Sequence, residues 1–415
     1  MGCQTGAVYR PDVLARPSEN NTRSMKTTFL LLLFYVFSSA MRAADENTNS
    51  LVQPTNRLAS IQREYAEAEF AYYKTNEILP DTAEGRKKSD ELWKKFDKKQ
   101  SDLFSEAVTL AKLDPKSDSG FAALEWVLTT PHSYYLPAGK PAMELTTQSY
   151  AADPKVGKIL AWVGYYPPDA KADSYPAAIN LIQNVAEKNP DRTARGQAVI
   201  ALAWQAKRKF SEAEYKKTSD VDSLAIEAEK AFDLVVKDYA DCPRLRNTLS
   251  GQQTLGQEAE QELFELQHLR IGKMAPDLDA KDLDGASFKL SDYHGRVTVL
   301  VFWASWCGPC MAMVPDERKL VDRMKNQSFV LIGVNGDPKL DDAKRAVAKE
   351  SMVWRSFWNG TNGPAGPISH AWNVRGWPTI YVLDGKGVIR EKNVRGEKLD
   401  KAVDLLMKEQ ASEKL

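Results

Sequence analysis

Cysteine is scarce in this chain of 415 residues, which contains only four. So few cysteines exclude a small scaffold held together by several disulfides. An excess of charge of one sign is also lacking, because 56 acidic residues balance 56 basic ones. This balance argues against nucleic-acid binding and against a polybasic membrane surface. The apolar run from Phe29 to Phe37 is shorter than the roughly 20 residues that a transmembrane helix needs.

Two of the four cysteines stand close together in the segment Trp306-Cys307-Gly308-Pro309-Cys310. The continuous apolar run Val297–Trp303 before them predicts a buried strand. A helix is expected after them, at roughly residues 310–326. At a helix N-terminus, free backbone N–H groups and the macrodipole favour a thiolate over a thiol. Because the thiolate is the species that attacks disulfides, Cys307 is a candidate nucleophile and Cys310 its resolving partner.

A zinc site and an inert buried pair are the structural alternatives for these cysteines. A zinc site needs four ligands, yet Cys3 and Cys242 form no second pair, and the spacing of His294 and His370 indicates no site. Against an inert pair stands a second motif, Gly376-Trp377-Pro378-Thr379, which opens another apolar run that predicts a strand. The redox interpretation of the cysteine pair is therefore favoured.

The N-terminal segment indicates export. From Met25 the chain has a positive residue, Lys26, then the apolar run Phe29–Phe37, then small residues that end at Ala40. This order is typical of a secretory signal peptide. Residues 1–44 are therefore predicted to be an upstream segment plus a signal peptide, with Met25 as the true start. An uncleaved membrane anchor is the alternative, and either way we expect a periplasmic protein, where disulfides persist.

The remainder of the chain is predicted to form a disordered tether (45–57), a helical domain (58–270), a thioredoxin-like α/β domain (271–410) and a short tail (411–415). The helical domain is inferred from apolar residues that recur every three or four positions and so share one helix face. The first such face consists of Leu58, Ile61, Tyr65, Ala68 and Tyr72. Beyond residue 271 the pattern changes to strands alternating with helices, which indicates an α/β domain.

The helical part contains three pairs of a capping residue and a proline, at spacings of 39 and 36 residues. They are Asp114-Pro115, Asp153-Pro154 and Asn189-Pro190. A capping residue followed by proline signals a helix start, and these spacings fall in the range of helical-hairpin repeats. Such arrays can expose a concave surface that binds a protein partner. An irregular helical bundle without that surface is the alternative.

Several aromatic residues and one cysteine of the helical part have no assigned role. The aromatics either line a groove or belong to the core; they are Tyr134, Tyr135, Trp162, Tyr165 and Tyr166. Cys242 is expected to be a lone thiol, buried or in a loop, because this half of the chain has no second cysteine to pair with it.

The α/β part is predicted to contain four main strands and three helices. Phe288–Leu290 is a candidate early strand, and Asp384–Gly387 is the expected turn of a hairpin. The expected strands are 297–303, 329–335, 379–383 and 388–392, and the expected helices are 310–326, 340–350 and 399–409.

Residues 271 to about 408 resemble the TlpA/ResA branch of thioredoxin-like proteins, which are exported thiol-disulfide oxidoreductases. The matching pieces are 272–277, 284–285, 289–295, Phe302–Cys310, Gly333–Asp337 and Trp377–Thr379. The resemblance implies a thioredoxin fold in which Pro378 is cis and lies against the disulfide. It also implies that the backbone beside Pro378 pairs with a substrate chain.

Two positions depart from the family. Thioredoxin has a buried aspartate six residues before its first cysteine, where this chain has Val301. TlpA/ResA proteins often have a glutamate three residues after the second cysteine, where this chain has Met313. In both families the carboxylate assists proton transfer to or from the resolving thiol. The absence of these carboxylates predicts either slower resolution or a water or Glu317 that takes over the role. Glu317 itself is expected to be a solvated charge on the helix face.

The resemblance implies a disulfide reductase, because a Gly-Pro pair between the cysteines is similar to that of reducing thioredoxins. In this mechanism the Cys307 thiolate attacks a protein disulfide docked at Gly308, Pro309, Trp377 and Pro378, and Cys310 then resolves the mixed disulfide. Trp306 is expected to pack beside the sulfurs and to shape the exposed rim. The mechanism needs no metal or organic cofactor, and the resemblance implies a membrane thiol-reductant relay as the electron donor.

Three other functions compete with the reductase. In an adaptor, the helical domain would bind a partner and the redoxin domain would be largely structural, but an adaptor does not need the cysteine pair. A peroxiredoxin would carry a Pro-x-x-x-Thr-x-x-Cys loop, which is absent. A haem-attachment site would need histidine at the position of Met311.

Overall fold

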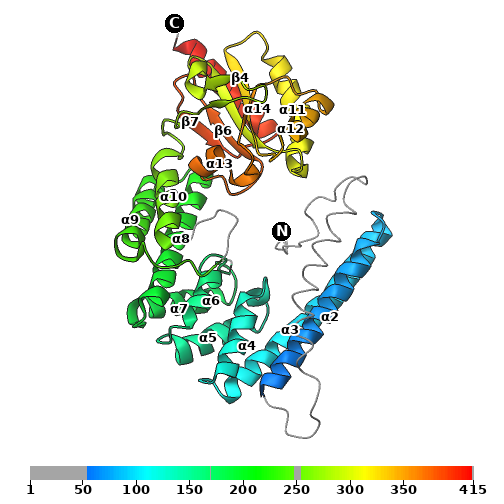
Figure 1. Ribbon diagram of the computed structural model, residues 1–415, viewed down its shortest axis with the longest axis vertical. Coiled ribbons are helices and arrows are strands. Elements are labelled where there is room, and N and C mark those ends of the chain that lie inside the picture. The colour runs from blue at the N-terminus through cyan, green and yellow to red at the C-terminus, as the bar shows by residue number, and fades with distance from the viewer. Residues whose placement is uncertain (1–53, 169, 247–253, 414–415) are drawn as a thin grey trace, which may run out of the picture. The chain divides into compact units, whose positions relative to one another are not determined.

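The computed structural model describes residues 54–168, 170–246 and 254–413 (Figure 1). These residues divide into two compact units, of which the first ends at Gln267 and the second begins at His268. The predicted signal peptide and most of the predicted tether lie outside the described residues. Among the helices that are described, none is both long and apolar enough to cross a membrane.

The first unit consists of helices. They are α2 (Pro54–Glu77), α3 (Ala83–Leu113), α4 (Asp118–Thr129), the short 3-10 helix η2 (Ser133–Tyr135), α5 (Gly139–Tyr150), α6 (Val156–Val163), α7 (Tyr175–Lys188), α8 (Arg192–Lys216), α9 (Val221–Tyr239) and α10 (Leu255–His268). Many consecutive helices pack against each other, and contacts also join α4 to α6, α5 to α7 and α6 to α8. Stacked helical hairpins make contacts of this kind, but the helical-repeat organisation stays a prediction.

Two apolar clusters form the core of the first unit, and α8 contributes to both. Ala198 and Ala201 face the larger cluster, which collects residues of α2 to α7. Val199 and Ala203 face a second cluster with α9 and α10. The second cluster includes Cys242, a free thiol that is buried, as expected. Five aromatic residues were expected either to line a groove or to belong to the core. Of these, Tyr135, Trp162 and Tyr166 are exposed.

The structure corrects the end of the predicted tether. Pro54–Arg57 forms the first turn of α2 rather than disordered chain. The guanidinium of Arg57 lies 3.4 Å from the carboxylate of Glu64 and 2.6 Å from that of Glu106 on α3. Proline is well tolerated in a first helical turn, and the two ion pairs give this turn partners that the sequence pattern did not indicate.

The three proline pairs do precede helices, but they do not cap them. Helices α4, α6 and α8 each begin two or three residues after the proline. The side chains that accept a backbone N–H at the start of α4 and α8 are Ser117 and Asp191. The Asx-Pro pairs therefore form the turns before the helices, and later residues supply the caps.

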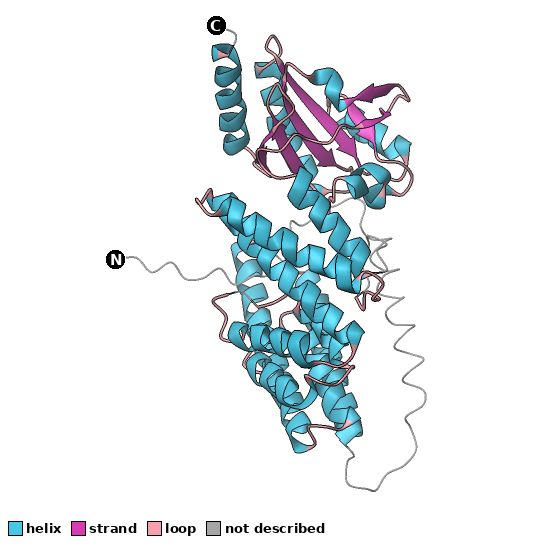
Figure 2. Ribbon diagram, turned by 90° about the vertical axis from the view of Figure 1, so that its left-hand side faces the viewer, coloured by secondary structure: helices cyan, strands magenta, loops and turns pink. Residues whose placement is uncertain are grey.

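The second unit has the thioredoxin fold, in which a mixed sheet is covered by helices. Its strands are β1 (Asp279–Lys281), β2 (Ser287–Lys289), β3 (Val297–Trp303), β4 (Phe329–Asn335), β5 (Ser356–Trp358), β6 (Thr379–Leu383) and β7 (Ile389–Lys392). Its helices are η3 (Leu290–Tyr293), α11 (Gly308–Arg323), α12 (Leu340–Lys349), η4 (Gly363–Ala365), α13 (Pro367–Ala371) and α14 (Glu397–Ser412). The main sheet has the order β5-β4-β3-β6-β7, and β1 pairs with β2 as a separate hairpin. Figure 2 shows the strands of this unit in magenta with helices packed against them.

The central strand β3 organises the second unit. It pairs parallel with β4 and antiparallel with β6, and all seven of its residues are buried. Its odd-numbered side chains, such as Val299 and Val301, pack in one cluster with residues of α11, α12 and α14. On the other face, Phe302 contacts Trp372 and Tyr381. A strand buried on both faces explains why β3 is a continuous apolar run.

Candidate active site

The loop between β3 and α11 carries the cysteine pair at one end of the sheet. Cys307 is the N-cap of α11, and its Sγ accepts a hydrogen bond from the backbone N–H of Cys310 at 3.2 Å. Gly308 and Pro309 form the first helical turn, where proline lacks only a donor that the helix does not use. The predicted strand–Cys-x-x-Cys–helix arrangement is therefore present, with α11 starting two residues earlier than expected.

Cys307 and Cys310 form a disulfide with a Cα–Cα distance of 5.2 Å. Both cysteines are buried, whereas Gly308 and Pro309 between them are exposed. A partner chain can therefore approach the sulfurs over the Gly-Pro turn. After reduction, the N-terminus of α11 would stabilise negative charge on Cys307, because helix N-termini favour thiolates.

Pro378 lies at the same end of the sheet as the cysteine pair. The pairing of β3 with β6 ends at Phe302 opposite Thr379, which puts Pro378 beside the last residue of β3. The Trp377–Pro378 peptide bond is cis, as the resemblance implied, and Pro378 is buried. Its carbonyl oxygen accepts a hydrogen bond from Arg395 at 3.2 Å.

Two tryptophans connect the cysteine loop to the Pro378 loop. The rings of Trp306 and Trp377 meet edge to face with centroids 5.9 Å apart, and Trp306 is 51% exposed. Trp377 also lies over Gly336, where an added Cβ would come within 2.5 Å of its Cη2 atom. The close approach of this ring therefore requires glycine at position 336. Together the two indoles form a rim beside the disulfide.

A buried aspartate that sequence reasoning did not single out anchors the cysteine loop. Asp337 follows β4, and its carboxylate accepts hydrogen bonds from the backbone N–H of Ser305 at 2.9 Å and from its hydroxyl at 2.6 Å. Asn335 donates to the same carboxylate at 2.7 Å. Because Ser305 directly precedes Trp306, these bonds position the entry to the cysteine motif. The sequence offered one signal for this residue: Asp337 ends the segment Gly333–Asp337, which resembles the TlpA/ResA family.

The expectation that Glu317 is a solvated charge is wrong. Its side chain lies on the buried face of α11 with Cys310, Val314 and Leu320, and only 5% of the residue is exposed. Burial, with a smaller contribution from Asp316, raises the pKa of Glu317 to about 7. Cys310, Val314 and Leu320 recur at helical spacing and mark this face. Helical periodicity could therefore have predicted the burial of Glu317.

The two positions that carry carboxylates in related families are apolar here. Val301 is buried in the same cluster as both cysteines, and Met313 is half-buried against that cluster. Glu317 is therefore the buried carboxyl group of α11, and its Oε1 atom has no hydrogen-bond partner among the described residues. In the parts of the chain that the structure describes, no group of three histidine, cysteine, aspartate or glutamate side chains could hold a metal ion.

Comparison with known proteins points to redox proteins. The sequence model of the AhpC/TSA family matches residues 271–392 of this chain. The thioredoxin-like protein YneN of Bacillus subtilis is 32% identical over 127 residues, which are 30% of this chain and 72% of that protein. The thiol-disulfide oxidoreductase ResA of Geobacillus kaustophilus is 31% identical over 122 residues, which are 29% of this chain and 67% of that protein.

Solved structures are also similar to part of the chain. The thioredoxin domain of a thiol-disulfide oxidoreductase from Bacteroides vulgatus is 26% identical and covers 33% of this chain and 97% of that structure, with a TM-score of 0.31.

Proposed function

Because the chain belongs to the ResA-like family of thioredoxin-fold thiol-disulfide oxidoreductases, we propose that it is an exported disulfide reductase that acts through Cys307 and Cys310. The observation that carries the proposal is the arrangement of this pair. The two sulfurs are bonded at the N-terminus of α11, beneath an exposed Gly-Pro turn and at the sheet end where the cis Pro378 lies.

The reaction is an exchange of two electrons between dithiol and disulfide. The Cys307 thiolate attacks one sulfur of a protein disulfide, forms a mixed disulfide and releases the other sulfur as a thiolate. The Cys310 thiolate then attacks Cys307, which forms the Cys307–Cys310 disulfide and releases the second substrate sulfur. The substrate has gained two electrons and, after protonation, two protons, and the cysteine pair has been oxidised.

The surroundings of the pair supply the docking surface in this proposal. Gly308 and Pro309 are exposed beside the disulfide, so a substrate chain meets no side chain there larger than a proline ring. Trp306 and Trp377 offer apolar area on the rim, and the backbone next to Pro378 pairs with the substrate. Regeneration needs an external dithiol donor, for which family resemblance favours a membrane thiol-reductant relay.

Export is supported by the sequence from Met25 to Ala40, which has the order of a signal peptide. The helical unit is proposed to bind a protein partner and so to influence which disulfide reaches Cys307.

A Cys310→Ala variant tests the proposal, because it can form the mixed disulfide but cannot resolve it. The full chain would be exported to the periplasm of a bacterial host, quenched with acid and separated without reductant. We expect covalent complexes through Cys307 that dithiothreitol releases, and none with the Cys307→Ala/Cys310→Ala control. In vitro, the wild type should accelerate insulin reduction by dithiothreitol.

Three outcomes would contradict the proposal. If no complex forms and the wild type does not accelerate insulin reduction, the adaptor hypothesis is favoured. If the oxidised protein forms disulfides in reduced substrates faster than the reduced protein breaks them, the direction is wrong. If the wild type and the Cys310→Ala variant both consume hydrogen peroxide with dithiothreitol as the reductant, and the Cys307→Ala/Cys310→Ala control does not, the protein is a peroxidase.

A further inference from the structure

The loops at the disulfide end of the main sheet expose basic side chains. Four loops meet there, because β3, β4, β5 and β7 end at this side of the sheet and β6 begins at it. The loops are residues 304–307, 336–339, 359–378 and 393–396. Their aspartate, glutamate, lysine and arginine residues are Asp337, Lys339, Arg375 and Arg395. Asp337 is buried and holds the cysteine loop, whereas the three basic residues are exposed.

The helices that follow these loops add acidic residues, most of which are paired. Asp341, in the first turn of α12, is exposed and compensates Lys339 two residues before it. The two acids in the first turn of α14 each contact a cation, at 2.6 Å and 2.9 Å; the pairs are Glu397–Lys401 and Asp400–Arg323. The positive charge that remains in the loops is that of Arg375, three residues before Pro378, and of Arg395.

Arg395 is held next to the cis peptide bond. Its Nη2 donates to the carbonyl oxygen of Pro378 at 3.2 Å. Asn393 fixes the same loop to β6, because its backbone N–H donates to the carbonyl of Ile380 at 2.8 Å and its side-chain oxygen accepts from the N–H of Ile380 at 3.2 Å. A guanidinium has five N–H donors, so four remain for a substrate. Among the described residues, none places a carboxylate within 4 Å of the exposed Arg395 side chain.

The opposite end of the sheet has mixed charge. There Arg355 lies 2.6 Å from Asp282, and Lys386 lies 3.0 Å from Glu413. A charged chain that approached this end would meet both signs. The basic character of the disulfide end is therefore local, in a chain whose acidic and basic residues balance.

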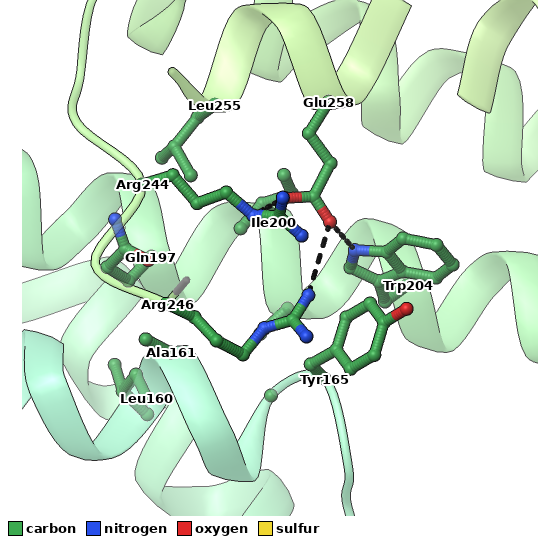
Figure 3. A pocket seen from close by; sticks show the side chains of 12 residues that line it. Leu160, Ala161, Tyr165, Gln197, Ile200, Trp204, Arg244, Arg246, Leu255 and Glu258 are labelled. Atoms are coloured by element: carbon green, nitrogen blue, oxygen red, sulfur yellow. Dashed lines mark hydrogen bonds and ion pairs between the residues drawn. The ribbon is translucent and has the colours of Figure 1, made fainter. Parts of the chain in front are cut away.

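Cations buried in the helical unit are also paired. Around the small pocket between α6, α8 and α10, Figure 3 shows the guanidinium groups of Arg244 and Arg246 directed at the carboxylate of Glu258. The distances are 2.6 Å for Arg244 and 3.9 Å for Arg246. The ammonium group of Lys207 contacts two further carboxylates of α10. Three cations thus meet three carboxylates, and this network balances its own charge, unlike the loop that carries Arg395.

We propose that the reductase prefers protein disulfides flanked by acidic residues, and that Arg395 is the side chain that contacts these acids. The inference rests on the proposed function, because it names the substrate class of the same site. In that function the substrate chain docks on the backbone beside Pro378, which is where the guanidinium of Arg395 lies. A planar guanidinium matches a carboxylate with two parallel hydrogen bonds. Its charge also attracts an acidic chain during encounter, an effect that salt screens.

Three matched peptides test the preference. Each contains one intramolecular disulfide, flanked on both sides by glutamate, by glutamine or by lysine. The full chain, reduced and freed of reductant, would be mixed with each peptide and quenched with acid, and the reduced peptide would be measured by chromatography. An exposed ion pair changes an equilibrium by up to about fivefold. We therefore expect the glutamate peptide to react at least about fivefold faster than the lysine peptide at low salt, with a ratio that approaches one in about 0.5 M NaCl.

An Arg395→Gln variant tests the assigned residue, because glutamine can still donate to the carbonyl of Pro378 but carries no charge. We expect the glutamate-to-lysine rate ratio to fall at least about threefold, and Arg395→Lys to restore most of it. The ratio is the readout because a change in the reactivity of Cys307 affects all three peptides equally. Arg296→Gln is the matched control, since Arg296 is exposed at the opposite end of the sheet. It removes the same charge and should leave the ratio unchanged.

The preference is wrong if the wild type reduces all three peptides at equal rates or the lysine peptide fastest; either result leaves the reductase function intact. A folded Arg395→Gln variant with the ratio of the Arg296→Gln control would show that Arg395 does not select the substrate. If the wild type reduces none of the peptides, the proposed function itself is wrong, and the preference is wrong with it. The peptide comparison needs only the wild type, so it decides the preference even if Arg395→Gln does not fold.

Discussion

Glu317 lies seven residues beyond Cys310 on the buried face of α11, two helical turns from the resolving cysteine. The rise of an α-helix puts the two Cα atoms about 10 Å apart, too far for a direct hydrogen bond between the side chains. An effect of Glu317 on Cys310 would therefore have to act through its charge or through an intervening water. Of the two positions that carry a carboxylate in related families, Met313 lies three residues from Cys310 and Val301 lies nine residues from it.

The first prediction concerns stability and pH. The folded pKa of Glu317 is about 7, well above the value of 4.5 for an unperturbed glutamate. The folded state therefore holds this proton more tightly than the unfolded state, and stability is lost as pH rises from about 4.5 to 7. We expect a loss of about 3 kcal/mol over this window, and Glu317→Gln should remove it. Urea unfolding at pH 5 and pH 8 measures the effect.

An Asp322→Asn variant is the control for this measurement, because Asp322 is an exposed acid on the same helix. It should keep the pH dependence of the wild type. Equal pH dependence in Glu317→Gln and the wild type would mean that Glu317 ionises normally in the folded protein.

The second prediction concerns the reaction rate. At an effective dielectric constant of 20, a charge about 10 Å away changes the free energy of a thiolate by roughly 1.7 kcal/mol. Ionised Glu317 should therefore disfavour the Cys310 thiolate, and Glu317→Gln should resolve mixed disulfides several-fold faster at pH 8 but not at pH 5. Stopped-flow measurement of single-turnover reduction tests this. A slower variant at pH 8 would instead identify Glu317 as a base that acts through water.

The third prediction concerns the anchor of the cysteine loop. Asp337→Ala leaves the N–H and hydroxyl of Ser305 and the amide of Asn335 without their acceptor. We expect a loss of roughly 3 kcal/mol in the free energy of unfolding, because the acceptor is charged and buried. Insulin reduction should slow because the loop that carries Trp306 is no longer held.

Two variants complete this test. Asp337→Asn keeps one acceptor oxygen and should recover part of both the stability and the rate. Asp322→Ala, at an exposed position of α11, should change the stability by less than about 0.5 kcal/mol. A stable Asp337→Ala variant with normal activity would show that Ser305 needs no anchor.

Long elements of the redoxin unit were predictable because each has a strong pattern of its own. The bounds of β3, β4 and β6 agree with the apolar runs, since strands buried by helices on the sheet faces need apolar residues at nearly every position. The three-residue strand β5 was missed because Ser356–Trp358 is too short to show a period. It is a strand through its pairing with β4, which is a tertiary interaction.

The site was predictable to the extent that its parts are adjacent in sequence. The cysteine motif and Trp377–Pro378 are local patterns. The contact of Asp337 with Ser305 joins residues 32 positions apart, and no periodicity connects a loop serine to a loop aspartate. The misjudged residue, Glu317, had a local signal, because it shares a helix face with Val314 and Leu320, but its charge outweighed that pattern in the prediction.

The last prediction concerns the glycine beneath the rim. At position 336 an added methyl group would lie 2.5 Å from Cη2 of Trp377, so Gly336→Ala must displace this indole or the backbone below it. Overpacking of this kind costs about 1–3 kcal/mol. Because Trp377 precedes Pro378 and contacts Trp306, we expect a slower reduction of insulin, with a larger effect on KM than on kcat. Gly376→Ala is the matched control, since an added Cβ there meets nothing within 4 Å. Equal KM values for Gly336→Ala and Gly376→Ala would exclude the rim from substrate docking.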